Sequence, residues 1–159
     1  MIIGVISDTH GLLREEVINN LSDCQLIIHA GDIGNGDIIK RLEEITNTIF
    51  VYGNIDKVES FDAKEKIIEV NDTRIYLIHN IKDIKCDLKG KKVNIVVYGH
   101  SHKSKINVED DILYLNPGSI GPRRFKLGTT MMKLYIEEDI VDYDFKFERY
   151  KVKIININV

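Results

Sequence analysis

Seven residues with metal-binding side chains recur along the chain in short polar motifs: Asp8, His10, Asp32, Asn54, His79, His100 and His102. Carboxylate, imidazole and amide groups in one set suit manganese, iron or zinc better than calcium. The donors are too many for one tetrahedral ion. They therefore predict two divalent ions, roughly 3.5–4 Å apart, that share one carboxylate.

The motif His100-Ser101-His102 is the most informative of these. Residues two apart in an extended chain project to the same side, so the two imidazoles would lie side by side. Without a shared ligand, two such polar rings would lack partners. Taken singly, each Asp or Asn is better explained as a turn or cap residue, and His79 is at least equally well explained as a hydrogen-bonded core residue. The metal hypothesis therefore depends on the whole set.

These side chains follow short apolar runs, which must position them. Continuous β-branched runs at 2–6, 26–29 and 48–52 predict buried strands, and the amphipathic segments 12–21 and 36–45 predict helices between them. Beyond residue 65 the pattern predicts a mainly antiparallel meander, with strands at 66–70, 73–78, 93–98, 105–108, 112–115, 129–136 and 140–148. Ligands gather at the carboxyl ends of strands in open α/β sheets, so the seven side chains are expected to converge on one rim.

Composition narrows the class of protein. A chain of 159 residues, 43% hydrophobic and 30% charged, predicts a single globular domain over residues 1–159. The formal charge of -3 gives no general attraction for nucleic acid. No stretch approaches the roughly 18 apolar residues of a membrane helix, and the start of the chain does not resemble a secretory signal. We therefore expect a cytoplasmic protein with no membrane partner, in which Cys24 and Cys86 are free thiols.

The ordered motifs Asp8-x-His10, Gly31-Asp32, Gly53-Asn54, His79 and Gly99-His100-x-His102 resemble those of the calcineurin-like metallophosphoesterases. The short length, together with Asn116-Pro117-Gly118-Ser119, is similar to the compact bacterial and archaeal phosphodiesterase branch. The resemblance implies an α/β fold, a four-layer αββα sandwich of two packed mixed sheets flanked by helices. It also implies one ion on Asp8, His10, Asp32 and His102, and a second on Asp32, Asn54, His79 and His100.

The implied activity is hydrolysis of a small phosphate ester by a metal-bridging hydroxide, with Asp32, Asn54 and His79 acting through that hydroxide. Two divalent ions are implied, with Mn²⁺ as the first expectation and Fe, Ni or Zn as alternatives. A phosphodiester is the first choice of substrate and a phosphomonoester the second. The rival from another class is a non-catalytic scaffold, since a retromer subunit of the same fold binds partner proteins. The sequence leaves open whether the chain forms a homo-oligomer.

Two positions depart from the family pattern. Many members follow the metal-binding Asn with a His that protonates the leaving group, whereas this chain has Ile55. Many carry Gly after the lone His, whereas Asn80 either narrows the pocket wall or hydrogen-bonds the substrate. Nearby polar residues receive structural interpretations in preference to functional ones. His29 is expected to be a core histidine instead of a group that orients Asp32, and Asp56 a turn acid instead of a proton donor. Asp37 is expected to cap a helix, Asn116–Ser119 to form a turn instead of directing backbone amides at the site, and Arg123 and Arg124 to be solvated instead of binding phosphate.

Overall fold

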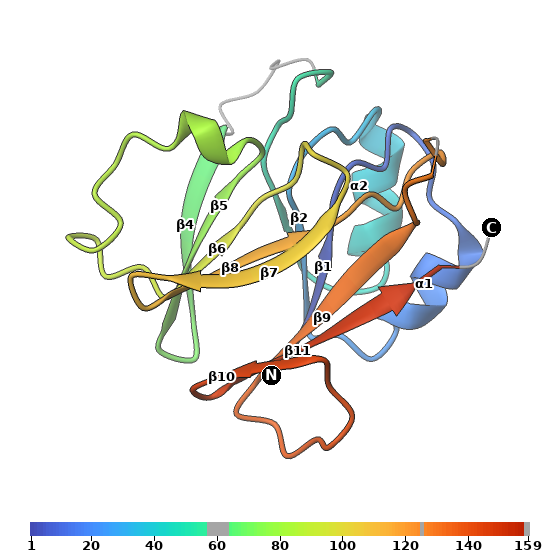
Figure 1. Cartoon of the computed structure of the whole chain (residues 1–159). Coiled ribbons are helices and arrows are strands. Elements are labelled where there is room, and N and C mark those ends of the chain that lie inside the picture. Colours follow the sequence, from blue (N-terminus) through green and yellow to red (C-terminus); the bar gives the residue numbers. More distant parts are fainter. Residues whose placement is uncertain (57–63, 125, 158–159) are drawn as a thin grey trace.

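Two mixed β-sheets lie face to face in this chain (Figure 1). The computed structural model describes residues 1–56, 64–124 and 126–157. The first sheet has six strands in the spatial order β10 (Phe145–Phe147), β11 (Tyr150–Asn156), β9 (Thr130–Ile136), β1 (Ile2–Ile6), β2 (Leu26–His29) and β3 (Thr48–Phe50). The second has five, in the order β4 (Glu65–Val70), β5 (Thr73–Ile78), β6 (Ile95–Val97), β8 (Ile112–Pro117) and β7 (Ser104–Glu109).

The helices α1 (Glu15–Leu21) and α2 (Gly36–Glu43) connect the parallel strands β1, β2 and β3 and cover the outer face of the first sheet (Figure 1). Ile6 packs against this helical layer, whereas Ile3 and Val5 face the core between the two sheets. Strand β1 is therefore buried on both faces, which explains its continuous apolar sequence. No helix in the described ranges is long and apolar enough to span a membrane.

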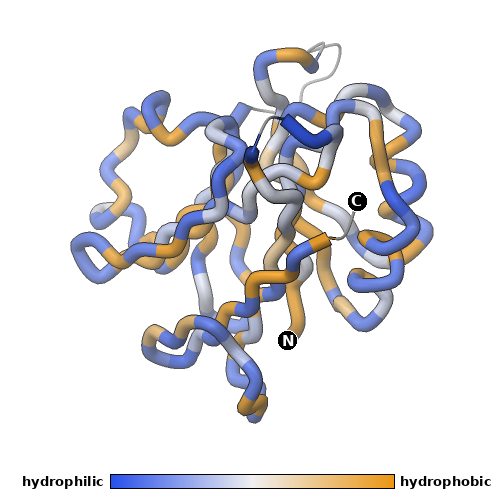
Figure 2. Tube along the Cα trace, turned by 45° about the vertical axis from the view of Figure 1, so that its right-hand side comes forward, coloured by the Kyte–Doolittle hydropathy of each residue, from blue (hydrophilic) through white to orange (hydrophobic). Residues whose placement is uncertain are grey.

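The outer face of the second sheet is covered by the 3₁₀ helix η1 (Ile81–Asp83) and the irregular segment 84–92. Tyr76 and Val96 pack there against Ile84 and Leu88. Figure 2 shows hydrophobic stretches along the strands and hydrophilic ones along the outer loops, as expected for a core between and beside the sheets. The predicted sandwich of two mixed sheets is confirmed, with its α-helices on the first sheet in the described part of the chain.

Several predicted elements were wrong in detail. Strands β5, β6 and β8 are parallel, not an antiparallel meander, because the long connections 79–94 and 98–111 let the chain cross over instead of turning back. Strand β9 returns to the first sheet and pairs with β1. The predicted strand 140–148 is reduced to β10, since residues 140–144 form a loop in which Val141 is 93% exposed. Strand β11 was not predicted.

The cap of α2 also differs from the prediction. Asn35, not Asp37, is the N-cap residue, and its side chain accepts a hydrogen bond of 3.1 Å from the Asp37 N–H. Asp37 lies two positions after this cap, in the first turn, where its charge interacts favourably with the positive end of the helix dipole.

Candidate metal centre

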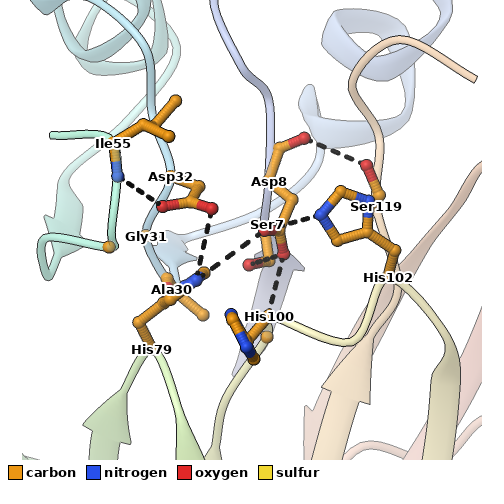
Figure 3. Close-up of polar contacts among 12 residues, drawn as sticks. Ser7, Asp8, Ala30, Gly31, Asp32, Ile55, His79, His100, His102 and Ser119 are labelled. Carbon is orange, nitrogen blue, oxygen red and sulfur yellow. Dashed lines mark hydrogen bonds and ion pairs between the residues drawn. The ribbon is translucent and has the colours of Figure 1, made fainter. Parts of the chain in front are cut away.

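The candidate ligands lie where the parallel strands of both sheets end (Figure 3). Asp8 and His10 follow β1, and Asp32 follows β2. His79 directly follows β5, and the segment with His100 and His102 follows β6. The carboxyl ends of β1, β2, β5 and β6 thus deliver side chains from both sheets to one place. Asn54 follows β3 and lines the adjoining cavity together with His79.

One group consists of Asp8, His10, Asp32 and His102, whose potential ligand atoms all lie within 4.8 Å of one another. The Asp8 Oδ1 atom is 3.2 Å from His102 Nε2 and 3.7 Å from His10 Nε2. The His10 Nε2 atom is also 3.6 Å from Asp32 Oδ2. Two carboxylates and two imidazoles around one point form a donor set that suits a divalent transition metal.

A second group surrounds His79. Its Nε2 atom is 3.3 Å from Asp32 Oδ2, and its ring lies edge-on to that of His100 with 5.3 Å between centroids. The His79 Nδ1 atom is 2.8 Å from the carbonyl oxygen of Ala30. Since a carbonyl only accepts, Nδ1 carries the proton, and the Nε2 lone pair of the neutral ring is available to a metal. Asp32 is the residue that both groups share.

The hydrogen-bond inventory supports a cation at this place. In the described part of the chain, the buried side-chain polar atoms without a hydrogen-bond partner are Asp8 Oδ1, His10 Nε2, His79 Nε2 and His102 Nδ1. Three of these atoms form one cluster, since His10 Nε2 and His79 Nε2 lie 3.7 Å and 3.9 Å from Asp8 Oδ1. Buried polar groups are nearly always paired, so this cluster requires a partner that the protein does not supply. A divalent metal is such a partner, and the residues present fit it.

Each carboxylate has one oxygen bound by the protein and one oxygen directed at the histidines (Figure 3). The Asp8 Oδ2 atom accepts hydrogen bonds from Ser7 Oγ at 2.6 Å and from the His100 N–H at 3.2 Å. The Asp32 Oδ1 atom accepts one from the Ile55 N–H at 3.2 Å. These contacts fix the orientation of both carboxylates and leave Asp8 Oδ1 and Asp32 Oδ2 available.

The charges of the site are set by burial and by these contacts. Burial would raise the pKa of Asp8, but His102 and Ser7 hold it below its ordinary value. Burial likewise opposes ionisation of Asp32, and His79 together with the Ile55 N–H lowers its pKa. Burial would lower the pKa of His79, yet Asp32 and Asp8 raise it above the ordinary value. Ionised carboxylates thus attract positive charge to this point, and a proton competes with a metal for it.

His29 is a satisfied core residue, as predicted. Its side chain is fully buried, and burial lowers its pKa to about 4, so the ring is neutral. The Nδ1 atom accepts from the Gly31 N–H at 3.1 Å, which leaves Nε2 to donate to Thr9 Oγ1 at 3.0 Å. Thr9 in turn donates to the carbonyl of Ile33 at 2.7 Å. This series of hydrogen bonds connects the loop after β1 to the loop after β2.

The backbone at the ligands is unusual. Asp8, His10, Asp32, His100 and His102 all have positive φ angles, between 46° and 74°. The expected extended conformation of His100-Ser101-His102 is therefore wrong. Because the chain turns at both histidines, their rings diverge, with His102 5.3 Å from the His10 ring and His100 next to His79. His102 thus belongs to the group around Asp8, and His100 to the group around His79.

Two glycines permit the close packing of the ligand loops. A Cβ atom at Gly53 would lie 2.1 Å from Asp32 Oδ1, and one at Gly99 would lie 2.1 Å from Ser7 Oγ. Both distances are far inside van der Waals contact. The glycines that precede Asn54 and His100 are therefore needed for the carboxylates and the loops to approach each other.

The structure also places the other singled-out residues. Asp56 is a structural acid, as predicted, because its carboxylate accepts from the backbone N–H groups of Ile33, Gly34 and Gly53. Asn80 accepts from the Lys82 N–H, so it caps η1 and forms part of the cavity wall. Arg123 and Arg124 are exposed, as predicted.

The turn at 116–119 does more than reverse the chain. The Asn116 side chain donates to the carbonyl of Gly99 at 3.1 Å and to Ser101 Oγ at 3.0 Å. The Ser119 hydroxyl donates to the carbonyl of Asp8 at 3.0 Å. Sequence reasoning did not assign these positioning contacts, nor that of Ser7. The polar residues next to the ligand motifs carried the signal, but their partners are distant in sequence.

We expect Asn116→Ala to lower the affinity for a divalent metal by about 10–100-fold, the usual effect of removing a group that orients a ligand loop. It should also reduce the free energy of unfolding by about 1–3 kcal/mol, because the Gly99 carbonyl loses its buried partner. Isothermal titration with Mn²⁺ and chemical denaturation measure the two effects. Asn107→Ala is the control, since Asn107 makes no side-chain hydrogen bond within the described ranges. Equal metal affinity in both variants would contradict the positioning role.

Comparison with known proteins agrees with this geometry. The sequence profile of the calcineurin-like phosphoesterase superfamily domain matches residues 1–139. A probable metallophosphoesterase of Methanocaldococcus jannaschii is 35% identical over 153 residues, covering 88% of this chain and 78% of that protein. A phosphodiesterase of the same organism is 30% identical over 139 residues, covering 74% and 83%. The crystal structure of wild-type Vps29 from Entamoeba histolytica, complexed with Zn²⁺, has a TM-score of 0.73 at 20% identity, covers 99% of this chain and 100% of its own, and shows likeness of fold alone.

Proposed function

The chain belongs to the calcineurin-like phosphoesterase superfamily, and on that premise we propose that it is a hydrolase that cleaves phosphodiesters with the help of two divalent metal ions. The observation that carries the proposal is the convergence of three buried, unpaired atoms: His10 Nε2 and His79 Nε2 lie 3.7 Å and 3.9 Å from Asp8 Oδ1. A fold without a bound cation has no reason to bury these atoms together.

The residues that would hold the ions form two overlapping sets. The first ion would be bound by Asp8, His10, Asp32 and His102, the group whose ligand atoms lie within 4.8 Å of one another. The second would be bound by Asp32, Asn54, His79 and His100, supported by the contacts of His79 with Asp32 and His100. When bound, such ions activate water and neutralise the charge of the phosphoryl oxygens.

The protein's own contribution is orientation. The Ile55 N–H binds Oδ1 of Asp32 and so leaves Oδ2 directed at the proposed metal site. The Ser7 hydroxyl binds Oδ2 of Asp8 and so leaves Oδ1 directed there. The Ala30 carbonyl fixes the proton on His79 Nδ1. A preorganised donor set of this kind does not have to rearrange during the reaction, which lowers the barrier.

A phosphodiester is the proposed substrate class because one of the relatives carries the name phosphodiesterase. A phosphomonoester is the alternative, and Mn²⁺ is the proposed metal, with Fe, Ni or Zn as alternatives of the same donor preference. A panel of aryl monoesters and diesters, assayed with each metal added to the metal-free chain, distinguishes these possibilities.

We expect the purified protein to contain up to two transition-metal ions per chain, because the donors exceed the capacity of one tetrahedral ion. Treatment with a chelator should stop the hydrolysis of bis(4-nitrophenyl) phosphate, and Mn²⁺ should restore it. Metal analysis by mass spectrometry and a colorimetric assay measure the two effects. Metal-free protein with unchanged hydrolysis would rule out the proposal. A chain that binds no metal and cleaves no ester of the panel would instead support the scaffold alternative.

A further inference from the structure

Three neighbouring loops carry candidate ligands and are joined to one another in two different ways. They are the Asp8 loop (residues 8–11), the Asp32 loop (31–34) and the Asn54 loop (53–56). Three backbone hydrogen bonds of 2.8–3.0 Å join the Asp8 loop to the Asp32 loop. The Asn54 loop makes no backbone–backbone hydrogen bond with the Asp32 loop, both of which lie in the described ranges. The pairing of β2 with β3 ends before these two loops begin.

The Asp56 side chain connects the Asp32 loop to the Asn54 loop instead. Its Oδ1 atom accepts hydrogen bonds from the Ile33 N–H at 2.9 Å and from the Gly34 N–H at 3.0 Å. Its Oδ2 atom accepts from the Gly53 N–H at 2.9 Å, within the Asn54 loop itself. A carboxylate can bridge the loops because both of its oxygens accept and neither donates. One side chain thus replaces a backbone connection.

This bridge also fixes the backbone around Asn54. The N–H group before Asn54, that of Gly53, donates to Asp56. The N–H group after it, that of Ile55, donates to Asp32 Oδ1 at 3.2 Å (Figure 3). Carboxylates therefore hold the chain on both sides of Asn54, and both connections lead to the Asp32 loop.

We propose that Asp56 is a positioning residue for the second metal ion, which holds Asn54 beside Asp32. The inference rests on the proposed function, because it concerns an ion of the same site. The first ion should not depend on Asp56, since the Asp32 loop stays joined to the Asp8 loop by backbone hydrogen bonds. Loss of the bridge should therefore weaken the binding of one ion and spare the other.

Asp56→Asn keeps the size of the side chain but replaces one acceptor oxygen with a donor. The new amide group would face an N–H group of one loop, so the bridge is lost. We expect calorimetric titration with Mn²⁺ to show an affinity for one ion that is about 10–100-fold lower than in the parent, and an unchanged affinity for the other. With two equivalents of Mn²⁺, electron paramagnetic resonance should show a coupled ion pair in the parent and isolated ions in the variant.

A double variant tests whether Asp56 acts through Asn54. Asn54→Ala removes the proposed ligand itself. We expect Asp56→Asn to add no further loss of affinity for the second ion in this background, because the group that it positions is already absent. A general loss of stability would instead add to the effect of Asn54→Ala.

Asp144→Asn is the matched control. Its carboxylate also accepts from a backbone N–H, that of Ile154, at 2.6 Å. It precedes β10, which forms the edge of the first sheet opposite to β3. The change in charge is the same, and both Mn²⁺ affinities should stay those of the parent. Hydrolysis should agree: Asp56→Asn should need about 10–100-fold more Mn²⁺ for half-maximal turnover and should approach the parent's kcat at saturating Mn²⁺.

Equal weakening of both ions in Asp56→Asn, or of neither, would overturn this inference, as would an additive effect in the double variant. The proposed function would stand if the parent bound two ions and cleaved the diester. Asp56→Ser, whose single hydroxyl oxygen cannot bridge both loops, gives the same comparison if Asp56→Asn does not fold. A parent that binds two ions but cleaves no ester would defeat the proposed function, and the titrations would still decide the role of Asp56. A parent that binds fewer than two ions would overturn both.

Discussion

Asp32→Asn should lower kcat/KM for a diester by at least about a hundredfold, because removing a group that merely supports a ligand already has effects of 10–100-fold. Asp32 is the residue shared by the two groups, with Oδ2 at 3.6 Å from His10 Nε2 and 3.3 Å from His79 Nε2. Asparagine keeps the acceptor for the Ile55 N–H, so the loop is retained. The variant removes the one charge that would serve both ions. We expect metal analysis to show reduced content at both positions.

Asp37→Asn is the control for this variant. It makes the same chemical change five positions along the chain, in the first turn of α2, where the side chain is exposed. We expect a loss of about 0.3–1 kcal/mol in the free energy of unfolding, from the weaker interaction with the helix dipole, and unchanged turnover. If both variants turned over like the parent, the assignment of Asp32 to the metal centre would be wrong.

The rate of the parent should fall steeply as the pKa of the leaving group rises, since Ile55 stands where the pattern implied by the family resemblance has a histidine acid. Its side chain is 50% exposed at the rim of the site, and its backbone N–H is already bound to Asp32. General acid catalysis usually contributes roughly 10²–10⁴-fold, so its absence affects alkyl leaving groups far more than acidic phenols. Asp56 does not replace it, because its carboxylate is bound by three backbone N–H groups.

A series of aryl and alkyl diesters, assayed with the parent and with Ile55→His, measures this dependence. We expect a steep dependence in the parent that flattens in the variant, with the largest gains, of roughly 10²–10⁴-fold, for alkyl diesters. Ile55→Gln is the control, because it adds polarity without an acid. A flat dependence in the parent would show that another group already protonates the leaving oxygen, and our interpretation of Ile55 would fail.

The predictable part of the fold is the part with local signals. The apolar runs of β1 and β2 and the spacing of apolar residues in α2 identified those elements. The pairing of β5, β6 and β8 was not predictable, because the apolar alternation of a short strand does not say which strand lies next to it. Strand β11 was not predicted for a different reason. Its lysines at 151 and 153 interrupt the apolar pattern, yet both ammonium groups reach partners in the segment 138–142.

The candidate site shows the same division. Asp8, Asp32 and His79 were predictable, because a polar residue that ends an apolar strand is a local feature. The contacts of Asn116 with Gly99 and of Ser119 with Asp8 join segments separated by 17 and 111 residues. No spacing rule in the sequence connects such positions. The direction of the His100 and His102 rings depended on backbone angles, which a two-residue spacing does not determine.

The left-handed backbone at five candidate ligands restricts how this site could be re-engineered or could have diverged. Such a conformation costs an ordinary L-residue roughly 1–2 kcal/mol, but asparagine, aspartate and histidine adopt it far more readily. The short side chains that bind metals are thus also the ones that this backbone tolerates. Exchange of Asp8 or His102 for glutamate or cysteine would strain the chain even where the new donor suits the metal. Changes in metal preference should therefore arise first at neighbours such as Ser7, and only later at the ligands.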